Sequence, residues 1–420
     1  MRILLVTEDV PAAMLGGAGQ HAVVLGNALL AQGHDVHLLG YRHGSPAPEE
    51  SEPCGFLGSL HLDINFSGAR WQEQRLGIFS PLARPHMARR LWAAIRSLPG
   101  PWDVVHYHGH NAMLGNLIPT SWNFVQTLHD QGAECITMSR LRQGQPCRET
   151  RAQACAGCAA KRPNPAQRWF STQAVRALRQ GSFTSFQRHK VVFVSEFVRH
   201  RYLAMLGITT SDIRSEVVHN FVDPQKLQAA LLNDPAPWPS EPHRLRVFAA
   251  GRIDQAKGFS SLLQVLDDTM LQRLDLVIAG DGPELAHLRE QHAGRGVRFL
   301  GWCQPATVLA WTRAAQVCVV PSIWEEPCAT TVLEALALGR PVLALRRGGT
   351  PELARYARAG QLRLFDELHE LVLALGEAQF APTPYNPSAV VNQRLPELLA
   401  VYNHPVTEDE VQKRALERFS

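Results

Sequence analysis

Ile3-Leu-Leu-Val6, Gly16-Gly-Ala-Gly19 and Val36-His-Leu-Leu39 are the three short stretches that decide the fold of this chain. The first and the third are continuous apolar runs of the kind that buried parallel strands need. Between them the glycines lead into a helical pattern over residues 21–32, which Gly33 ends. Strand, glycine loop, helix and strand form one βαβ unit, whose crossover should be right-handed.

The same alternation continues outward from this unit. Apolar runs predict further strands at 104–105, 124–128 and 191–194, and helical patterns lie between them at 85–98 and 167–180. Strands that alternate with helices are typical of a parallel sheet covered on both faces. The first half of the chain is therefore predicted to be a doubly wound α/β domain that ends near residue 223.

A proline-rich stretch separates this half from a second series of the same kind. Residues 233–242 hold four prolines in ten positions, which is typical of a linker. The predicted elements that follow are strands at 246–250, 274–279, 297–300, 317–320 and 342–345, helices at 259–266 and 284–291, and an amphipathic helix at 394–402. We expect an N-terminal domain over 1–225, a linker over 226–243, a C-terminal domain over 244–388, and a final helix within 389–420 that packs back on the N-terminal domain.

Length and composition agree with two soluble domains. The chain has 420 residues, whereas a single core stops growing at about 250–300 residues. It is 45% hydrophobic and 19% charged, and no run reaches the roughly 18 apolar residues that cross a bilayer. The apolar run that begins at Ile3 is too short for a signal peptide. We therefore expect a cytoplasmic protein, either free or peripheral at the inner face of the membrane.

Positive charge is concentrated in one part of the chain. The net charge is +4, but residues 140–201 alone hold thirteen Lys or Arg against two acids. A solvated face is one interpretation, and contact with anionic lipid or a phosphorylated acceptor is the other. The helix predicted at 85–98 is also basic, but core packing explains its apolar face better than a membrane surface does. Nucleic acid is not expected as a partner, because no binding module accompanies the charge.

Two loops of the second half carry charged residues at the carboxyl ends of predicted strands. Arg252 and Lys257 suit a diphosphate, although ordinary surface charge is an alternative. Glu326 and Glu334 suit vicinal hydroxyls, although they could instead complement a helix that begins near Ala329. Ligands of such sheets bind beyond the carboxyl ends of the strands, where both loops lie.

The motifs, taken together and in order, resemble glycosyltransferase family 4. In the second half they are Gly251-Arg-x4-Lys-Gly258, Gly280-Asp-Gly-Pro283, Pro321-Ser-x3-Glu-Pro-x6-Glu-Ala335 and Gly348-Gly-x-Pro-Glu352. In the first half they are Gly16-Gly17, Asp103-x2-His106-x-His108, Thr127-x-His129 and Asn220-Phe-Val-Asp223. The resemblance covers essentially the whole chain, and it implies the GT-B fold, two Rossmann-like domains that face a central cleft.

The resemblance implies a role for each matching residue. It assigns the chain the transfer of a sugar from a UDP- or GDP-sugar to a hydroxyl of a glycan or lipid-linked acceptor, with retention of anomeric configuration, as a hexosyltransferase of polysaccharide or lipopolysaccharide biosynthesis does. His129, Arg252, Lys257 and Glu326 would be catalytic. The donor would bind to Gly17, Arg252, Lys257, Glu326, Cys328, Ala329, Thr330 and Glu334.

No cofactor is expected, because the cations would take the place of a divalent ion and the chain has no Asp-x-Asp motif.

Departures from the family pattern are Phe221, where the hinge usually has glycine, and Cys328-Ala329, where Phe-Gly is common. The alternatives are a nucleotide-sugar epimerase, a glycan phosphorylase or another GT-B enzyme, a dehydrogenase, and a non-catalytic scaffold. An epimerase would need an acid/base group, and a phosphorylase would need a lysine that binds pyridoxal phosphate. The sequence offers no convincing candidate for either residue.

Two clusters of metal-binding residue types need separate interpretation. Cys135, Cys147, Cys155 and Cys158 end in a Cys-x2-Cys half-site, and structural zinc, free thiols and disulfides all stay open. His106, His108, His110 and His129 lack a further ligand at fixed spacing, so residues lining a pocket or bonded in the core are favoured over a metal site. No catalytic metal is expected.

Overall fold

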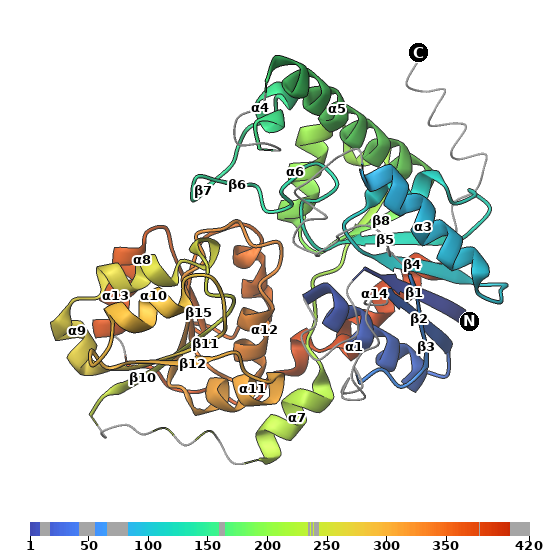
Figure 1. Ribbon diagram of the computed structural model, residues 1–420. Coiled ribbons are helices and arrows are strands. Elements are labelled where there is room, and N and C mark those ends of the chain that lie inside the picture. The colour runs from blue at the N-terminus through green and yellow to red at the C-terminus, as the bar shows by residue number, and fades with distance from the viewer. Residues whose placement is uncertain are drawn as a thin grey trace. The chain divides into compact units, whose positions relative to one another are not determined.

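The computed structural model describes residues 1–8, 17–41, 55–64, 83–158, 164–233, 236, 238, 243–377 and 379–403. These residues divide into two compact units, each of which contains one large parallel sheet (Figure 1). Unit 1 comprises residues 1–140, 147–219 and 394–420, and unit 2 comprises 141–146 and 220–393. Most of the proline-rich stretch and residues 404–420 lie outside the described residues.

Unit 1 is built on a seven-stranded sheet in the order β3-β2-β1-β4-β5-β8-β9. Each neighbouring pair is parallel. In that order the strands are β3 (Ser59–Ile64), β2 (Asp35–Tyr41), β1 (Arg2–Thr7), β4 (Val104–His108), β5 (Phe124–Leu128), β8 (Lys190–Phe193) and β9 (Arg214–Val217). The helices are α1 (Gly17–Ala31), α3 (Ala83–Ser97), η1 (Ala112–Asn116), α4 (Ala152–Ala156), α5 (Pro165–Arg188), α6 (Glu196–Leu206), η2 (Thr210–Asp212) and most of α14 (Val391–Asn403).

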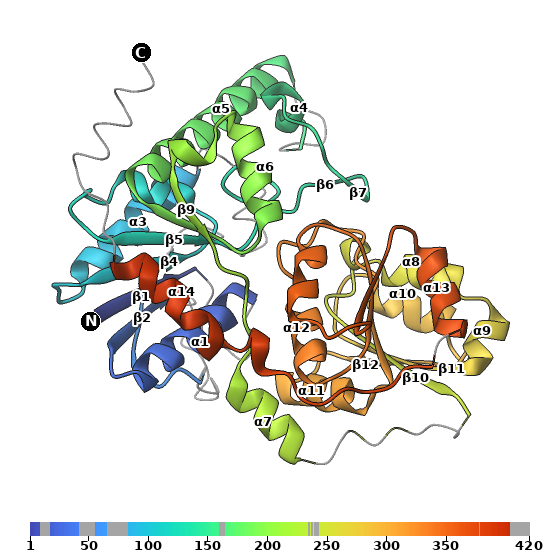
Figure 2. The same ribbon diagram turned by 180° about the vertical axis from the view of Figure 1, so that it is seen from behind.

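Alternate residues of the strands in unit 1 face different helices. Leu4, Val6 and Tyr107 belong to a core that α3 covers with Met87 and Leu91. The intervening residue His106 points the other way, and its Nδ1 lies 2.6 Å from the hydroxyl of Tyr402 on α14. The two helices lie on opposite faces of the sheet, α3 toward the viewer in Figure 1 and α14 toward the viewer in Figure 2. This is the period-2 pattern of a sheet buried on both sides.

Unit 2 repeats the same construction with six parallel strands in the order β12-β11-β10-β13-β14-β15. In that order they are β12 (Val297–Gly301), β11 (Leu274–Ala279), β10 (Leu245–Ala250), β13 (Val317–Val320), β14 (Val342–Leu345) and β15 (Leu362–Phe365). The helices are α7 (Pro224–Leu232), η3 (Gln255–Lys257), α8 (Phe259–Val265), α9 (Asp268–Arg273), α10 (Leu285–Gln291), α11 (Pro305–Ala314), α12 (Thr330–Ala337), η4 (Thr350–Tyr356), α13 (Leu368–Glu377) and η5 (Pro387–Ala389). A short antiparallel pair, β6 (Leu141–Arg142) and β7 (Gln145–Pro146), lies apart from both sheets.

Local sequence signals explain where several helices begin and end. The carboxylate of Asp223 accepts from the backbone N–H of Gln225 and starts α7, with Pro224 in the first helical position. Ser195 caps α6 in the same way, and Gly207 ends it in the left-handed conformation at φ 66°. α7 occupies the beginning of the stretch where the sequence predicts a linker, while α14 groups with unit 1 from Arg394 onward.

Candidate functional site

The topology of unit 2 marks where a ligand would bind. The strand order reverses direction between β10 and β13, which are neighbours in the sheet. In open α/β sheets the crevice beyond such a switch point is the usual ligand site, because the connections leave it on opposite sides. The loop after β10 holds Arg252 and Lys257, and the loop after β13 holds Glu326. The two segments singled out by sequence therefore follow adjacent strands.

The side chains of these two loops meet. The ammonium of Lys257 donates to Oε1 of Glu326 at 2.5 Å. The hydroxyl of Ser322 donates to the same oxygen at 2.7 Å. The backbone N–H groups of Ile323 and Trp324 both donate to the carbonyl of Ala256, at 3.1 and 3.0 Å. A hydrogen-bonded junction thus fixes the cation against the carboxylate.

Two glycines allow the chain segments of this junction to approach so closely. Gly258 has φ +72°, and a Cβ atom there would lie 2.1 Å from the carbonyl oxygen of Pro321. Gly348, in the turn after β14, has φ +58°, and its Cβ would lie 2.2 Å from the carbonyl oxygen of Glu326. The backbone N–H of Gly349 donates to that same carbonyl at 2.7 Å. Only glycine combines this backbone conformation with this proximity.

Exposure divides the charged groups into an anchored pair and an accessible cation. The side chain of Glu326 is 7% exposed and that of Lys257 is 26% exposed. Arg252, on the same loop, is 54% exposed and pairs with Asp254 at 3.3 Å. An ammonium has three N–H donors, so Lys257 can keep its hydrogen bond to Glu326 and still donate to an anionic oxygen of a ligand. Arg252 can add the planar fork that suits phosphate.

The helix that follows the second loop adds backbone donors and a second carboxyl group. α12 begins at Thr330, and Ala329 at its N-cap has no side-chain acceptor to cap the first turn. Such a helix start attracts anions. Glu334 lies in the next turn, partly buried. Burial raises its pKa to about 7, and the ammonium of Lys226 on α7 opposes that shift.

Cys328 and Ala329, the residues that replace the more common Phe-Gly, are buried beside this helix start. The carbonyl of Cys328 accepts from the side-chain amide of Asn220 at 3.4 Å. Burial raises the pKa of the Cys328 thiol to about 12, so the group is a neutral thiol at physiological pH. Cys328 therefore acts as a small apolar side chain here rather than as a nucleophile.

Unit 1 has its own switch point, between β1 and β4, and histidines gather near it. His108 ends β4 and His129 follows β5, and their Nδ1 and Nε2 atoms lie 3.0 Å apart. His21 of α1 completes a group whose ligand atoms all lie within 4.8 Å of one another, the one such group of His, Cys, Asp or Glu within the described ranges. Burial, followed by neighbouring imidazoles, lowers the pKa of both His21 and His108. Neutral imidazoles of this kind could hold a metal ion or hydrogen-bond a polar ligand.

Not all of the histidines singled out by sequence belong to this group. His106 is fully buried between Tyr402 and the hydroxyl of Thr127, which lies 2.7 Å from its Nε2. Burial lowers its pKa to about 3, so His106 stays neutral and is a hydrogen-bonded residue of the core. His110 instead pairs with the carboxylate of Asp130 at 2.5 Å.

The structure thus brings Lys257 and Glu326 together and places Arg252 on the same loop, with the start of α12 following the second loop. Gly17 is the first residue of α1 in unit 1, whereas Gly16 lies outside the described residues. Sequence reasoning missed Asp254, Ser322 and Lys226. The Pro-Ser motif contained a signal for Ser322, but nothing in the sequence near Lys226 indicates its interaction with Glu334.

Comparison with known families identifies the class of protein. Residues 244–377 match the family described as glycosyl transferases group 1. Residues 15–226 match the family described as Glycosyltransferase Family 4. Two Rossmann-like parallel sheets with these matches define a GT-B glycosyltransferase. The chain belongs to glycosyltransferase family 4, as its motifs predicted.

Individual relatives agree with this assignment. The chain is 23% identical over 375 residues to an uncharacterized glycosyltransferase of Methanocaldococcus jannaschii, covering 85% of this chain and 83% of the relative. It is 27% identical over 371 residues to a phosphatidyl-myo-inositol mannosyltransferase of Mycobacterium leprae, covering 84% and 80%. These relatives are transferases, so the epimerase alternative is not favoured.

Solved structures share the fold at lower identity. A sucrose-phosphate synthase from Thermosynechococcus elongatus superposes with a TM-score of 0.61 at 17% identity, covering 100% of this chain and 98% of that one. An Anabaena protein crystallised with UDP and glucose superposes with a TM-score of 0.55 at 15% identity, covering 100% and 99%. In the part of the chain that the structure describes, no helix has both the length and the apolar character needed to span a bilayer.

Proposed function

We propose that this protein transfers a hexose from a UDP- or GDP-sugar to a hydroxyl of a glycan or lipid-linked acceptor, with retention of configuration and without a metal ion. The observation that carries the proposal is the Lys257–Glu326 junction at the switch point of unit 2. A cation held beside a carboxylate matches a sugar diphosphate, which has anionic oxygens on one side and hydroxyl donors on the other.

In the proposed chemistry, the protein stabilises the leaving nucleoside diphosphate. Lys257 and Arg252 donate to its oxygens as negative charge develops, while the uncapped start of α12 adds backbone donors. Glu326 accepts from hydroxyls of the donor sugar, and Glu334 accepts from the ribose. The two cations offset the negative charge of the leaving diphosphate, as a divalent ion would otherwise do. This is the basis for proposing that the reaction needs no metal ion.

Retention follows in this account from attack on the face that the diphosphate leaves. The acceptor oxygen forms its bond to the anomeric carbon as the carbon–phosphate oxygen bond breaks, and the acceptor proton passes to a donor phosphate oxygen. No dedicated protein base is then required. His129 contacts the transferred sugar and positions the acceptor hydroxyl. Its neighbours His21 and His108, whose pKa values are lowered, keep neutral imidazoles around it.

The acceptor is proposed as a lipid-linked intermediate of polysaccharide or lipopolysaccharide synthesis, at the inner face of the membrane. The thirteen cations between residues 140 and 201 support a phosphorylated or lipid-bound acceptor. The mannosyltransferase relative is named for a phosphatidyl-inositol substrate, which is consistent with this class.

Donor and product analysis test the proposal together. Thermal-shift titration with UDP, GDP, ADP and CMP should give stabilisation by UDP or GDP, since only a ligand of the native state raises the melting temperature. NMR of the product formed from the matching sugar donor, without added divalent ions, should show the anomeric configuration of the donor. Inverted product, turnover that requires added Mg²⁺ or Mn²⁺, or isomerised donor formed without acceptor would each contradict the proposal.

A further inference from the structure

Four of the cysteines occupy a segment that has little regular structure to hold it. Residues 134–158 contain only the two-residue strands β6 and β7 and the five-residue helix α4. The core beneath them consists of Ile136, Val175 and Leu178, a far smaller set than the cores under the sheets. A segment that buries so little apolar surface usually needs a covalent or metal cross-link to keep one conformation.

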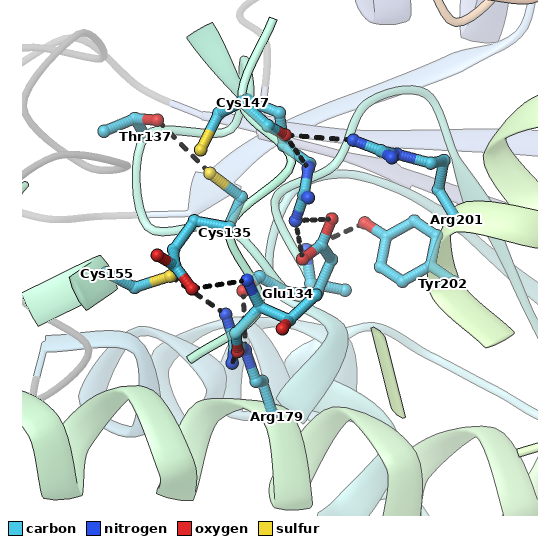
Figure 3. Close-up of polar contacts among 12 residues, drawn as sticks. Glu134, Cys135, Thr137, Cys147, Cys155, Arg179, Arg201 and Tyr202 are labelled. Atoms are coloured by element: carbon cyan, nitrogen blue, oxygen red, sulfur yellow. Dashed lines mark hydrogen bonds and ion pairs between the residues drawn. The ribbon is translucent and has the colours of Figure 1, made fainter. Parts of the chain in front are cut away.

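The thiols of this segment come together from separate places in the chain. Cys135 lies in the turn after His129, Cys147 follows β7, Cys155 is on α4, and Cys158 comes just after it. In Figure 3 the sulfur atoms of Cys135 and Cys147 point toward each other, with Cys155 nearby. Burial raises the pKa of the Cys155 thiol; Arg179 partly offsets this shift, and the neighbouring thiols of Cys135 and Cys147 add to it.

The backbone brings the last two cysteines to the same end of α4. The N–H of Cys158 donates to the carbonyl of Cys155 at 3.0 Å, which forms a tight turn between them. Both side chains pack against the same small core. A Cys-x2-Cys turn of this kind presents two sulfurs to one ion in structural zinc sites.

Arginines surround the cluster and suit a negatively charged centre. The guanidinium of Arg179 donates to the sulfur of Cys155 at 3.2 Å and to the carbonyl of Glu134 at 3.2 Å. Arg140 and Arg201 both donate to the carbonyl of Cys147, at 3.1 and 3.0 Å. Four thiolates on a divalent ion carry two net negative charges, which neighbouring guanidinium groups can offset.

We propose that Cys135, Cys147, Cys155 and Cys158 bind one Zn²⁺ ion that fixes the structure of residues 134–158. Zn²⁺ takes four thiolates in a tetrahedron, and binding releases one proton from each thiol. Cys135, Cys147 and Cys155 do not all have their sulfurs within 4.8 Å of one another. Rotation about the Cα–Cβ bonds therefore has to bring them to metal distance. The proposal is independent of the donor chemistry, because all four cysteines belong to unit 1 and the Lys257–Glu326 junction to unit 2.

The test is the metal content of the full-length protein, purified without chelator or histidine tag. Mass spectrometry of the metal should find one zinc per chain, and a mercurial that caps thiols should release it. After replacement of zinc by Co²⁺, intense sulfur-to-cobalt absorption should report thiolate ligands. Cys155→Ser and Cys158→Ser should each lose most of the zinc, whereas Cys303→Ser, a half-buried cysteine of unit 2, should keep it.

Free thiols, disulfides and an iron–sulfur cluster would each give a different experimental result. A metal-free native protein with four reactive thiols would overturn the proposal, as would a mass lowered by two hydrogens for each disulfide. Iron with visible absorption would overturn zinc in favour of an iron–sulfur cluster. If the serine variants fail to fold, zinc release from wild type decides the matter, and equal resistance of residues 134–158 to protease before and after release would contradict the structural role. Nucleotide-induced thermal shift is measured in parallel, so that failure of donor binding is recognised separately.

Discussion

A single buried carboxylate organises the candidate site. Glu326 accepts from both Lys257 and Ser322, and its own backbone carbonyl accepts from Gly349. Breaking a partly desolvated ion pair by removing one partner leaves an uncompensated charge, which costs more than the pair contributes. A substitution at this junction is therefore informative about donor binding only when the fold of the variant is shown to be intact.

Glu334 predicts a pH dependence of donor affinity. Its pKa of about 7 means that the carboxyl group is half protonated near neutral pH, and only the carboxylate is purely a hydrogen-bond acceptor for ribose hydroxyls. Affinity for the nucleotide sugar should fall about tenfold between pH 8 and pH 6, because the ionised fraction falls by about that factor. Isothermal titration checks this. A sugar diphosphate does not itself titrate in this range, and Glu334→Gln should flatten the profile. A wild-type profile as flat as that of the variant would contradict this role.

The same group predicts the sign of a stability effect. Because the folded pKa is raised above its usual value of 4.5, the contribution of Glu334 to stability is greatest below that value and is lost as pH rises toward about 7. Glu334→Gln removes the titrating group. Its free energy of unfolding should therefore improve relative to wild type between pH 5 and pH 8, which urea unfolding at the two pH values measures.

At the scale of the element, α14 is tied to unit 1 by polar contacts at its last turn. The hydroxyl of Tyr402 lies 2.6 Å from Nδ1 of His106. The backbone carbonyl of Tyr402 accepts from the side-chain amide of Asn123 at 2.7 Å. Both Tyr402 and His106 are buried, so loss of the hydroxyl leaves a buried imidazole nitrogen without its partner.

Tyr402→Phe should therefore destabilise the protein by about 1–3 kcal/mol, the cost of an unsatisfied buried polar group. Urea unfolding followed by fluorescence measures it. Tyr385→Phe is the matched control, since Tyr385 is only partly buried and lies in unit 2. Equal stability of the two variants would show that the hydroxyl does not anchor the helix.

The central strands and the edge strand β12 could be predicted from sequence, whereas the other three edge strands could not. The runs at 274–279, 317–320 and 342–345 became β11, β13 and β14 with the same bounds. β3, β9 and β15 were missed because edge strands have only one neighbour, so their sequences are mixed rather than continuously apolar. The helix predicted at 167–180 runs from Pro165 to Arg188, since Gly181 interrupts the pattern without ending the helix.

The candidate site was predictable to the extent that its residues lie in the loops after central strands. Lys257 and Glu326 are 69 positions apart, yet parallel β10 and β13 bring their loops to one edge. The motifs therefore gave the residue types, and the sheet order gave their proximity. The Glu334–Lys226 interaction and the place of His21 beside His108 depend on how helices pack, which no local pattern encodes.

At the scale of the whole molecule, the two units repeat one architectural solution with different chemistry. Each has a parallel sheet with a switch point, between β1 and β4 in unit 1 and between β10 and β13 in unit 2. Neutral imidazoles lie near the first, and an ammonium–carboxylate pair lies beyond the second. The chain also leaves unit 1 and returns to it at Arg394, so unit 1 is completed only by the last helix.

Direct titration of the nucleotide sugar against Lys257→Ala tests the central claim, that the Lys257–Glu326 junction holds the donor diphosphate. Arg295→Ala serves as control, because Arg295 is also a paired cation of unit 2 but precedes β12, at the amino edge of the sheet. Loss of a charged hydrogen bond worth about 1.5–3 kcal/mol should weaken donor binding by roughly tenfold to a hundredfold in Lys257→Ala, with the control near wild type. Donor affinity in Lys257→Ala equal to that of wild type, with the fold intact by circular dichroism, would contradict the account.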